Sequence, residues 1–508
     1  MGMACGLADA LDSHDWDRVN DLLNANFFRY LMDCPQLLSR VFQEASAEWF
    51  ETYPRHAMSR AIAEAVSRPG MVLDPSSSDA FQRWVKMRTL PAARDVLGVQ
   101  QARLRELLAQ GWCRDASALV DGILGTISAA PHRSDGFDDV MPPILLRCGV
   151  AKFLADDFAG AAGCFSEGSR WATLRAEHPI ARFLREHLAL IHALQERFSA
   201  AGALLGESPA ARSEPHTMRY HLEPAGIVAR ILVRTASLDV VAPCDLEQLD
   251  DVIEASDIGW AALHARALVT AAGGGGGAWG VIHRINTVLS TGSRGTAPAT
   301  IAGSTLRADL AGLYQSVGDL AAAESVLSTP GLLPRGERLI ISLARQALLR
   351  GRPSHALSLL RNDGRVTGGA VSARHLPTGA ILYATAELAT AGEVSRTTLE
   401  FVASTINHHQ AHVALTHASR ALRKELAPLI ERDIAGIPAP WRYQVRAELT
   451  PREREVLAAL ATHPTVDEVA AALHVSPNTV KTHVRALYQK LGAHNRSEAL
   501  SLAQRMSQ

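Results

Sequence analysis

The stretch Ser476-Pro477-Asn478-Thr479-Val480-Lys481-Thr482-His483-Val484-Arg485 decides the fold of the C-terminal part of this chain. Ser476 can cap the free amides at the start of a helix, and Pro477 suits the first helical position. Turning the stretch by about 100° per residue separates two faces. The apolar face holds Val480, Val484, Leu487 and Leu491, and the polar face holds Asn478, Lys481, Thr482, Arg485 and Gln489. The pattern predicts an amphipathic helix that ends before Gly492.

The charge of this helix is one-sided. Between Ser476 and Arg496 the charged residues are Lys481, Arg485, Lys490 and Arg496, and no carboxylate stands among them. A helix that lies in the major groove of DNA, between two rows of phosphates, needs such a face. The plainer alternative is a solvated basic face on an ordinary helical bundle.

Three further helix starts surround this helix. Each has a capping residue followed three positions later by Glu: Thr450 with Glu453, Thr465 with Glu468, and Asn495 with Glu498. The second of these helices is short and stops near His474, so only a brief hinge separates it from the acid-free helix. Because this composite pattern is much stricter than any single cap, it favours a DNA-binding helix-turn-helix over the plain bundle.

The segment from about 447 to 507 resembles the LuxR-type (GerE, NarL-like) DNA-binding domain. The resemblance is carried by Leu449-Thr450, Arg452-Glu453, Glu455-Val456-Leu457, Thr479-Val480-Lys481, His483 and Lys490-Leu491-Gly492. It implies a four-helix domain whose third helix enters the major groove and whose fourth helix supports dimerisation.

The resemblance also implies roles for single residues. Contacts to base edges fall to Lys481, Thr482 and Arg485. Contacts to the DNA backbone fall to Thr465, Ser476, Asn478, Thr479 and Arg496. Dimer contacts fall to Glu498, Ala499, Leu500, Leu502 and Ala503.

The composition of the whole chain favours helices packed on helices. Of the 508 residues, 47% are hydrophobic but only 5% are aromatic, and the formal net charge is −1, so any affinity for nucleic acid must be local. Six scattered cysteines without a Cys-x-x-Cys pair indicate buried thiols in a reducing compartment. The N-terminus lacks a secretion signal, and no apolar run approaches the roughly 20 residues of a membrane span. We therefore expect a cytoplasmic protein with no membrane partner.

Before Leu449 the sequence is repetitive. The stretch from Leu310 to Leu327 aligns with the stretch from Leu343 to Leu360 at an offset of 33 residues, close to the tetratricopeptide period of about 34. Each copy reads as a helix, a Gly turn and a second helix. Less regular copies follow Asp15-Trp16, Gly111-Trp112, Asp157-Phe158 and Arg197-Phe198.

Stacked hairpins of this kind wind into a superhelix with a concave groove suited to a peptide or a small ligand. We therefore predict an all-α chain with a tetratricopeptide-like array over 1–433, a linker over 434–448 marked by Ala435-Gly436-Ile437-Pro438-Ala439-Pro440, and the helix-turn-helix domain over 449–508. Generic helical packing is the alternative for the array. More loosely, the array resembles the helical-repeat portion of large MalT-like LuxR-family regulators, without the ATP-binding module that precedes it there.

Two motifs point to other chemistry and are disfavoured. The run from Gly273 to Gly277 lacks the Lys-Ser/Thr that a phosphate loop needs, so it reads as a turn between helices. His408 and His412 would share a face of one helix at zinc-binding spacing, but no carboxylate or cysteine stands beside them. The preferred interpretation is a polar helical face that titrates near neutrality. No catalytic residue, metal or cofactor is predicted.

Together these patterns predict a sequence-specific transcriptional regulator, not an enzyme. It would bind double-stranded DNA as a homodimer, work with RNA polymerase, and use the array to sense a small-molecule or peptide ligand or a partner. The alternative is a helical-repeat scaffold that recruits transcription machinery or another protein, with DNA binding only as targeting.

Overall fold

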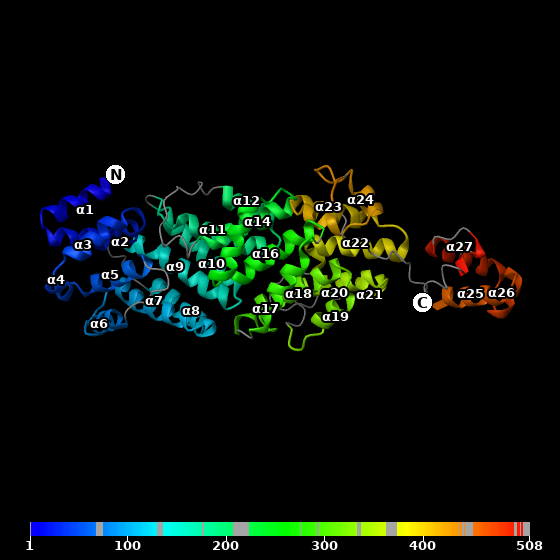
Figure 1. Ribbon diagram of the computed structural model, residues 1–508, viewed down its shortest axis with the longest axis horizontal. Coiled ribbons are helices and arrows are strands. Elements are labelled where there is room, and N and C mark those ends of the chain that lie inside the picture. Colours follow the sequence, from blue (N-terminus) through cyan, green and yellow to red (C-terminus); the bar gives the residue numbers. More distant parts are fainter. Residues whose placement is uncertain are drawn as a thin grey trace. The chain divides into compact units, whose positions relative to one another are not determined.

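The computed structural model describes residues 2–67, 75–129, 136–174, 177–206, 223–274, 276–291, 294–332, 337–361, 373–434, 436–438, 441, 451–491, 495–497 and 499–500. Within these ranges every regular element is a helix, so the all-α prediction is confirmed. The elements, with η for 3-10 turns, are α1 Gly2–Asp12, α2 Trp16–Asp33, α3 Pro35–Glu44, α4 Ala47–Thr52, α5 Pro54–Ser67, α6 Pro75–Lys86, α7 Ala93–Ala109, α8 Cys113–Ala129, α9 Phe137–Leu154, α10 Phe158–Ala172, α11 Ala181–Leu194, α12 Phe198–Gly206, α14 Pro224–Ala236, α15 Pro243–Ala255, α16 Gly259–Ala272, α17 Ala278–Ser290, η1 Arg294–Thr296, α18 Ile301–Ser316, α19 Leu320–Leu327, α20 Glu337–Leu349, α21 Pro353–Arg361, η3 Ala373–His375, α22 Pro377–Ala391, α23 Arg396–His409, η4 His412–His417, α24 Arg420–Leu426, α25 Pro451–Thr462, α26 Val466–Ala472 and α27 Pro477–Leu491 (Figure 1).

The helices divide into two compact units. The first comprises Met1–Arg234, Val241–Ala265 and Ser293–Gly295, and the second comprises Thr235–Val240, Arg266–Gly292 and Thr296–Gln508. In the residues that the structure describes, none of the helices is long and apolar enough to cross a membrane.

The two regular repeats of the sequence are helical hairpins, as predicted. α18 and α19 are joined at Gly318, and α20 and α21 are joined at Gly351; both glycines have a positive φ, of 86° and 69°. Only glycine adopts this left-handed conformation without a steric penalty. α18 packs against both α19 and α20, so consecutive hairpins bury each other's apolar faces.

The irregular copies form the same turn with other residues. His14, Gly111, Asp156 and Glu196 all have a positive φ, and each stands two positions before the second helix of its hairpin. Asp15, Asp157 and Asp319 then cap that helix by accepting a hydrogen bond from the backbone amide three positions later. The left-handed residue is therefore common to these hairpins, and in three of them a capping aspartate follows it.

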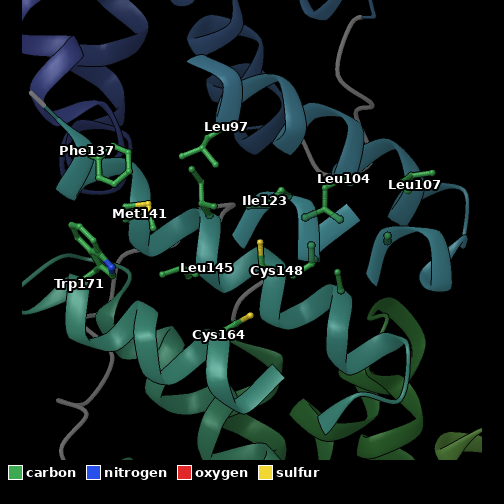
Figure 2. Packing of buried hydrophobic residues seen from close by; sticks show 14 residues of the cluster. Leu97, Leu104, Leu107, Ile123, Phe137, Met141, Leu145, Cys148, Cys164 and Trp171 are labelled. Carbon is green, nitrogen blue, oxygen red and sulfur yellow. The ribbon is translucent and has the colours of Figure 1, made fainter. Parts of the chain in front are cut away.

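The core of the first unit shows how stacked hairpins pack. α7, α8, α9 and α10 contribute buried side chains to one continuous cluster (Figure 2). Its labelled members are Leu97, Leu104 and Leu107 from α7, Ile123 from α8, Phe137, Met141, Leu145 and Cys148 from α9, and Cys164 and Trp171 from α10. Helices from two neighbouring hairpins thus share one hydrophobic interior, which stabilises the stack.

Three expectations about single residues need correction. α23 ends at His409 because Gln410 is left-handed, with a φ of 56°, so His408 and His412 do not share one helical face. His412 lies instead in η4, where burial lowers its pKa, so the expected solvated position that titrates near neutrality is wrong for His412, whereas His408 is exposed. The cysteines are not all buried either, because Cys5 and Cys244 are exposed.

The glycine run forms a turn, as expected. Gly273, Gly274, Gly276 and Gly277 lie between the end of α16 and the start of α17, and two of them have a positive φ. Gly275 lies outside the described residues.

Gly379 marks a close approach of backbone to backbone in the second unit. A Cβ atom built on this third residue of α22 would lie 1.8 Å from the carbonyl oxygen of Ala373 in η3. Overpacking usually costs about 1–3 kcal/mol, and a clash with backbone is harder to relieve than one with a side chain. We therefore expect Gly379→Ala to lower the free energy of unfolding by about 3 kcal/mol.

Urea unfolding followed by circular dichroism would measure this change. Gly280→Ala is the matched control, because Gly280 is an exposed helical glycine in the same unit whose Cβ would meet no atom within 4 Å. That variant should gain stability, by up to about 1 kcal/mol, since alanine is the better helix former. Equal effects of the two substitutions would contradict the close approach at Gly379.

Candidate nucleic-acid interface

α25, α26 and α27 form a small domain around their own core. Val456 and Leu460 of α25, Val469 of α26, and Val480 and Leu487 of α27 are its largest buried side chains. Val484, which the sequence places on the same stripe of α27, packs against this core and is half-buried. The apolar face of the predicted amphipathic helix is therefore confirmed.

The hinge between α26 and α27 is short and closed by hydrogen bonds. His474 takes a left-handed conformation with a φ of 53°, and the amide of Val475 donates to the carbonyl of Ala470 at 3.0 Å. Ser476 then caps α27 by accepting from the amide of Thr479 at 3.2 Å. These contacts hold α27 at a defined angle to α26, which is what a helix-turn-helix requires.

Arg452 secures this hinge from the other side, a role that sequence reasoning missed. Its guanidinium donates to the carbonyl of Leu473 at 3.1 Å and to the Glu455 carboxylate at 2.6 Å. The sequence motif contains Arg452, but nothing in the residue pattern specifies a backbone carbonyl as its acceptor.

The polar face of α27 is open to solvent. Asn478, Lys481, Thr482 and Arg485 are all exposed, and they lie within two turns of one helix. The Thr482 hydroxyl donates to the carbonyl of Asn478 at 3.0 Å, which leaves its lone pairs free to accept. Among the described residues, no carboxylate forms an ion pair with Lys481 or Arg485.

The residues assigned to DNA-backbone contacts stand at helix starts. Thr465 caps α26 by accepting from the amide of Glu468 at 3.3 Å, and the Ser476 and Thr479 hydroxyls lie 2.8 Å apart at the start of α27. All three are exposed. Helix N-termini carry free amides and a partial positive charge, which suits phosphate. At α26, however, Asp467 and Glu468 in the first turn oppose this attraction.

Arg496 occupies a different environment from the other cations of the domain. It is half-buried, and its guanidinium donates to the carbonyls of Leu460, His463 and Pro464, at and just beyond the end of α25. Burial raises the pKa of the nearby Tyr488, and the Arg496 charge acts in the opposite direction. Arg496 therefore ties the fourth helix to α25, and its contact with phosphate stays a prediction.

The fourth helix is described only in part. Arg496, Ser497, Ala499 and Leu500 are helical, whereas Glu498, Leu502 and Ala503 lie outside the described residues. Ala499 is 0% exposed within the single chain, so it supports the fold of the domain. Leu500 is half-buried and keeps some surface for a contact with another molecule.

Comparison with known proteins agrees with this geometry. Residues 447–503 match the family described as bacterial regulatory proteins, luxR family. The chain is 41% identical over 83 residues to the probable transcriptional regulatory protein NarL of Mycobacterium tuberculosis, a match that covers 16% of this chain and 38% of that protein. It is 45% and 47% identical over 60 residues to the HTH-type transcriptional regulator MalT of Yersinia enterocolitica and Yersinia pestis, a match covering 12% of this chain and 7% of each relative.

The matched segment and the three described helices coincide. The chain covers 38% of the NarL relative and 7% of the MalT relatives, so the likeness concerns only a minor part of each of those proteins. Its hinge, its caps and the exposed basic face of α27 are the parts that such a domain needs. The C-terminal part of this chain is a helix-turn-helix domain of the luxR family of bacterial regulatory proteins.

Proposed function

We propose that the protein is a sequence-specific DNA-binding transcriptional regulator in which α27 lies in the major groove. The observation that carries this proposal is the exposed face of α27, which presents Lys481, Thr482 and Arg485 together without a paired carboxylate among the described residues. A face kept only for solubility is usually mixed in charge, because alternating signs also stabilise the helix through ion pairs four residues apart.

Lys481 and Arg485 would read base edges. Both residues are hydrogen-bond donors only, so they suit the N7 and O6 acceptors that guanine presents in the major groove. Thr482 can accept from a base while its hydroxyl still donates to the Asn478 carbonyl, and its own methyl group can contact a thymine methyl group. Lys481 and Arg485 are four residues apart, about one helical turn, so they would contact neighbouring positions of one half-site.

The starts of α26 and α27 would set the register on the DNA. The exposed Thr465, Ser476, Asn478 and Thr479 stand where free amides meet the positive end of a helix. Contacts from such groups go to phosphates and position the domain without reading sequence. Because Asp467 and Glu468 weaken the attraction at α26, α27 would carry most of the phosphate binding.

Two copies would bind a twofold-related site, with contacts between their fourth helices. Leu500 is the described residue with surface left for that contact. The helical array would sense a small molecule, a peptide or a partner and thereby change how two DNA-binding domains pair. Such coupling requires that the ligand bind the two arrangements with unequal affinity. A regulator of this kind would act with RNA polymerase in the cytoplasm.

Binding to genomic DNA fragments tests the proposal, and single substitutions test the assignment of contacts. After selection of bound fragments, we expect Lys481→Ala and Arg485→Ala each to weaken the selected site by roughly 1–3 kcal/mol and to relax preference at one base position. Asn478→Ala should weaken all sequences by similar factors, because a phosphate contact reads no base. Fluorescence anisotropy at a fixed salt concentration would measure these affinities.

Two results would contradict the proposal. If the wild-type protein bound every fragment equally, DNA binding would serve only to localise a scaffold, and pulldown with polymerase subunits would then test that alternative. If Lys481→Ala, Arg485→Ala and Asn478→Ala changed all affinities by the same factor, the division into base-reading and phosphate-binding residues would be wrong.

A further inference from the structure

Trp441 lies in the segment that joins the helical array to α25, yet its side chain is buried against the array. Only 7% of its surface is exposed. Its ring stacks on the His417 imidazole with centroids 4.8 Å apart and planes inclined by 22°. The guanidinium carbon of Arg345 lies 4.7 Å from the centroid of the same ring. A linker whose only task is to connect two domains needs no such contact.

The array holds these partners of the indole in place. Arg345 of α20 donates to the Gln315 side chain at 2.8 Å and to the Ser342 hydroxyl at 3.2 Å. Gly312 of α18 leaves room for this arrangement, because a Cβ at that position would lie 3.3 Å from Nη2 of Arg345. Burial and the charges of Arg345 and Arg423 hold the pKa of His417 well below its usual range, so its imidazole stays neutral beside the arginine.

The site is nearly filled by the indole. The cavity that remains beside Trp441 has a volume of about 80 Å³ and is bordered by α16, α18 and α20. This is room for a few water molecules, whereas pockets for small ligands usually measure about 300–1,000 Å³. A ligand of ordinary size can therefore enter only if Trp441 leaves.

The preceding residues attach the same segment to the array. Arg423 of α24 donates to the carbonyls of Ile437 and Pro438, the latter at 2.7 Å, and Ile434 is buried in the core around α22 to α24. From Trp441 to Pro451 the chain has ten residue steps and spans at most about 36 Å. If the segment came free from Ile434 onward, seventeen steps would span at most about 61 Å.

We propose that the Arg345–His417 site is a receptor for a planar aromatic group, occupied by Trp441 in the resting protein and by a small aromatic effector when the array is engaged. The effector would resemble indole in size and would be an uncharged ring, because Arg345 faces the π surface of the bound ring, and Asp309 and Arg338 also line the cavity. By displacing Trp441 it would lengthen the tether of the DNA-binding domain. This inference rests on the proposed function only in taking the array as the sensor.

The physical basis is that the site recognises a π face and not a particular residue. Stacking on an imidazole and contact with a guanidinium are open to any flat aromatic ring of suitable size. Trp441 has the advantage of being tethered, which gives it an effective concentration in the millimolar range against a free competitor. A free effector must therefore bind tightly enough, at its own concentration, to compete with the docked Trp441.

Chemical complementation of Trp441→Ala tests the receptor site in the full-length protein. The probe is 5-fluoroindole, followed by ¹⁹F NMR. We expect the Trp441→Ala protein to bind it at least about tenfold more tightly than the wild type, since its tethered competitor is gone. Trp279→Ala is the matched control, because Trp279 is an exposed tryptophan of the same unit outside this site. Equal affinity of the Trp441→Ala and Trp279→Ala proteins would overturn the proposal.

Trypsin cleavage of the full-length protein after Arg442, the residue next to Trp441, tests without DNA whether Trp441 leaves its site. Losing a desolvated cation–π contact together with a stacked ring should raise the cleavage rate of the Trp441→Ala protein roughly 10- to 100-fold over wild type and Trp279→Ala. Saturating 5-fluoroindole should accelerate cleavage of the wild type in the same sense. If 5-fluoroindole bound without changing the cleavage rate, displacement of Trp441 by an effector would be ruled out, whatever the protein does on DNA.

Gly312→Ala is a second variant that leaves Trp441 unchanged. The added methyl group would press on the Arg345 guanidinium and weaken its contact with the indole, so cleavage after Arg442 should accelerate by a smaller factor of roughly 3 to 10. Its helical circular dichroism should match the wild type, which separates a weaker hold on Trp441 from unfolding. If trypsin cleaved this variant at the wild-type rate, the role given to Arg345 would be wrong.

Discussion

Replacing Asp139 by Ala is expected to lower the free energy of unfolding of the first unit by about 3–5 kcal/mol. Asp139 lies on α9, and its side chain is only 2% exposed. Its carboxylate accepts from the backbone amides of Phe28 at 2.7 Å and Arg29 at 3.1 Å, and it lies 3.3 Å from Nε2 of His178.

The break in α2 explains why these bonds matter. Asn26 has non-helical angles, with a φ of −144° and a ψ of 33°, so the helix restarts after it and leaves amides without intrahelical acceptors. Asp139 caps this restart from another helix. Alanine would leave two amides and the buried His178 without their acceptor, and a buried unsatisfied group costs about 1–3 kcal/mol.

Two companion variants separate this cap from general effects of removing an acid. Asp139→Asn keeps one acceptor oxygen and should lose roughly half as much stability. Asp115→Ala removes an exposed carboxylate in the first turn of α8 and should cost less than about 1 kcal/mol. Urea denaturation of the three proteins measures the differences. Similar losses for Asp139→Ala and Asp115→Ala would show that the cap contributes little.

The sequence predicted the hairpins because their determinants are local. A glycine or another left-handed residue, a capping Asp and apolar residues at helical spacing all lie within one stretch such as Gly318-Asp319-Leu320. The cap on α2 joins residues 111 positions apart, so no local pattern reveals it. The end of α23 before Gln410, which separates His408 from His412, could not be predicted either. A non-glycine residue in the left-handed conformation has no strong signature in the sequence.

The helix-turn-helix domain shows the same division between local and distant determinants. Periodicity alone placed Val480 and Leu487 in the core and Lys481 and Arg485 on the open face, as the structure has them. Arg496 is different, because its acceptors are backbone carbonyls, which carry no signature in the sequence. Arg496 ends a stretch from Ser476 that holds no carboxylate, so it reads as a phosphate contact when only side chains are compared. The contacts of Trp441 could not be predicted because its partners, Arg345 of α20 and His417 of η4, are distant in the sequence.

Replacing Arg496 by Ala is expected to destabilise the helix-turn-helix domain by about 2–4 kcal/mol, because three charge-assisted bonds to backbone carbonyls are lost at a half-buried position. The carbonyl of Leu460 lies in the last turn of α25 and that of His463 just beyond its end, where no intrahelical donor is available. Without the guanidinium, the packing of the fourth helix on α25 weakens as well.

Hydrogen exchange of the α25, α26 and α27 amides in the full-length protein measures this loss without interference from the array. Arg454→Ala removes an exposed cation from the same domain and should leave the exchange rates unchanged within a factor of about three. Arg496→Lys separates the two roles, because lysine keeps the charge for phosphate but lacks the planar fork that serves three carbonyls. Faster exchange in both Arg496 variants indicates a structural brace. Unchanged exchange with weaker DNA binding in Arg496→Ala alone would instead make Arg496 a phosphate contact.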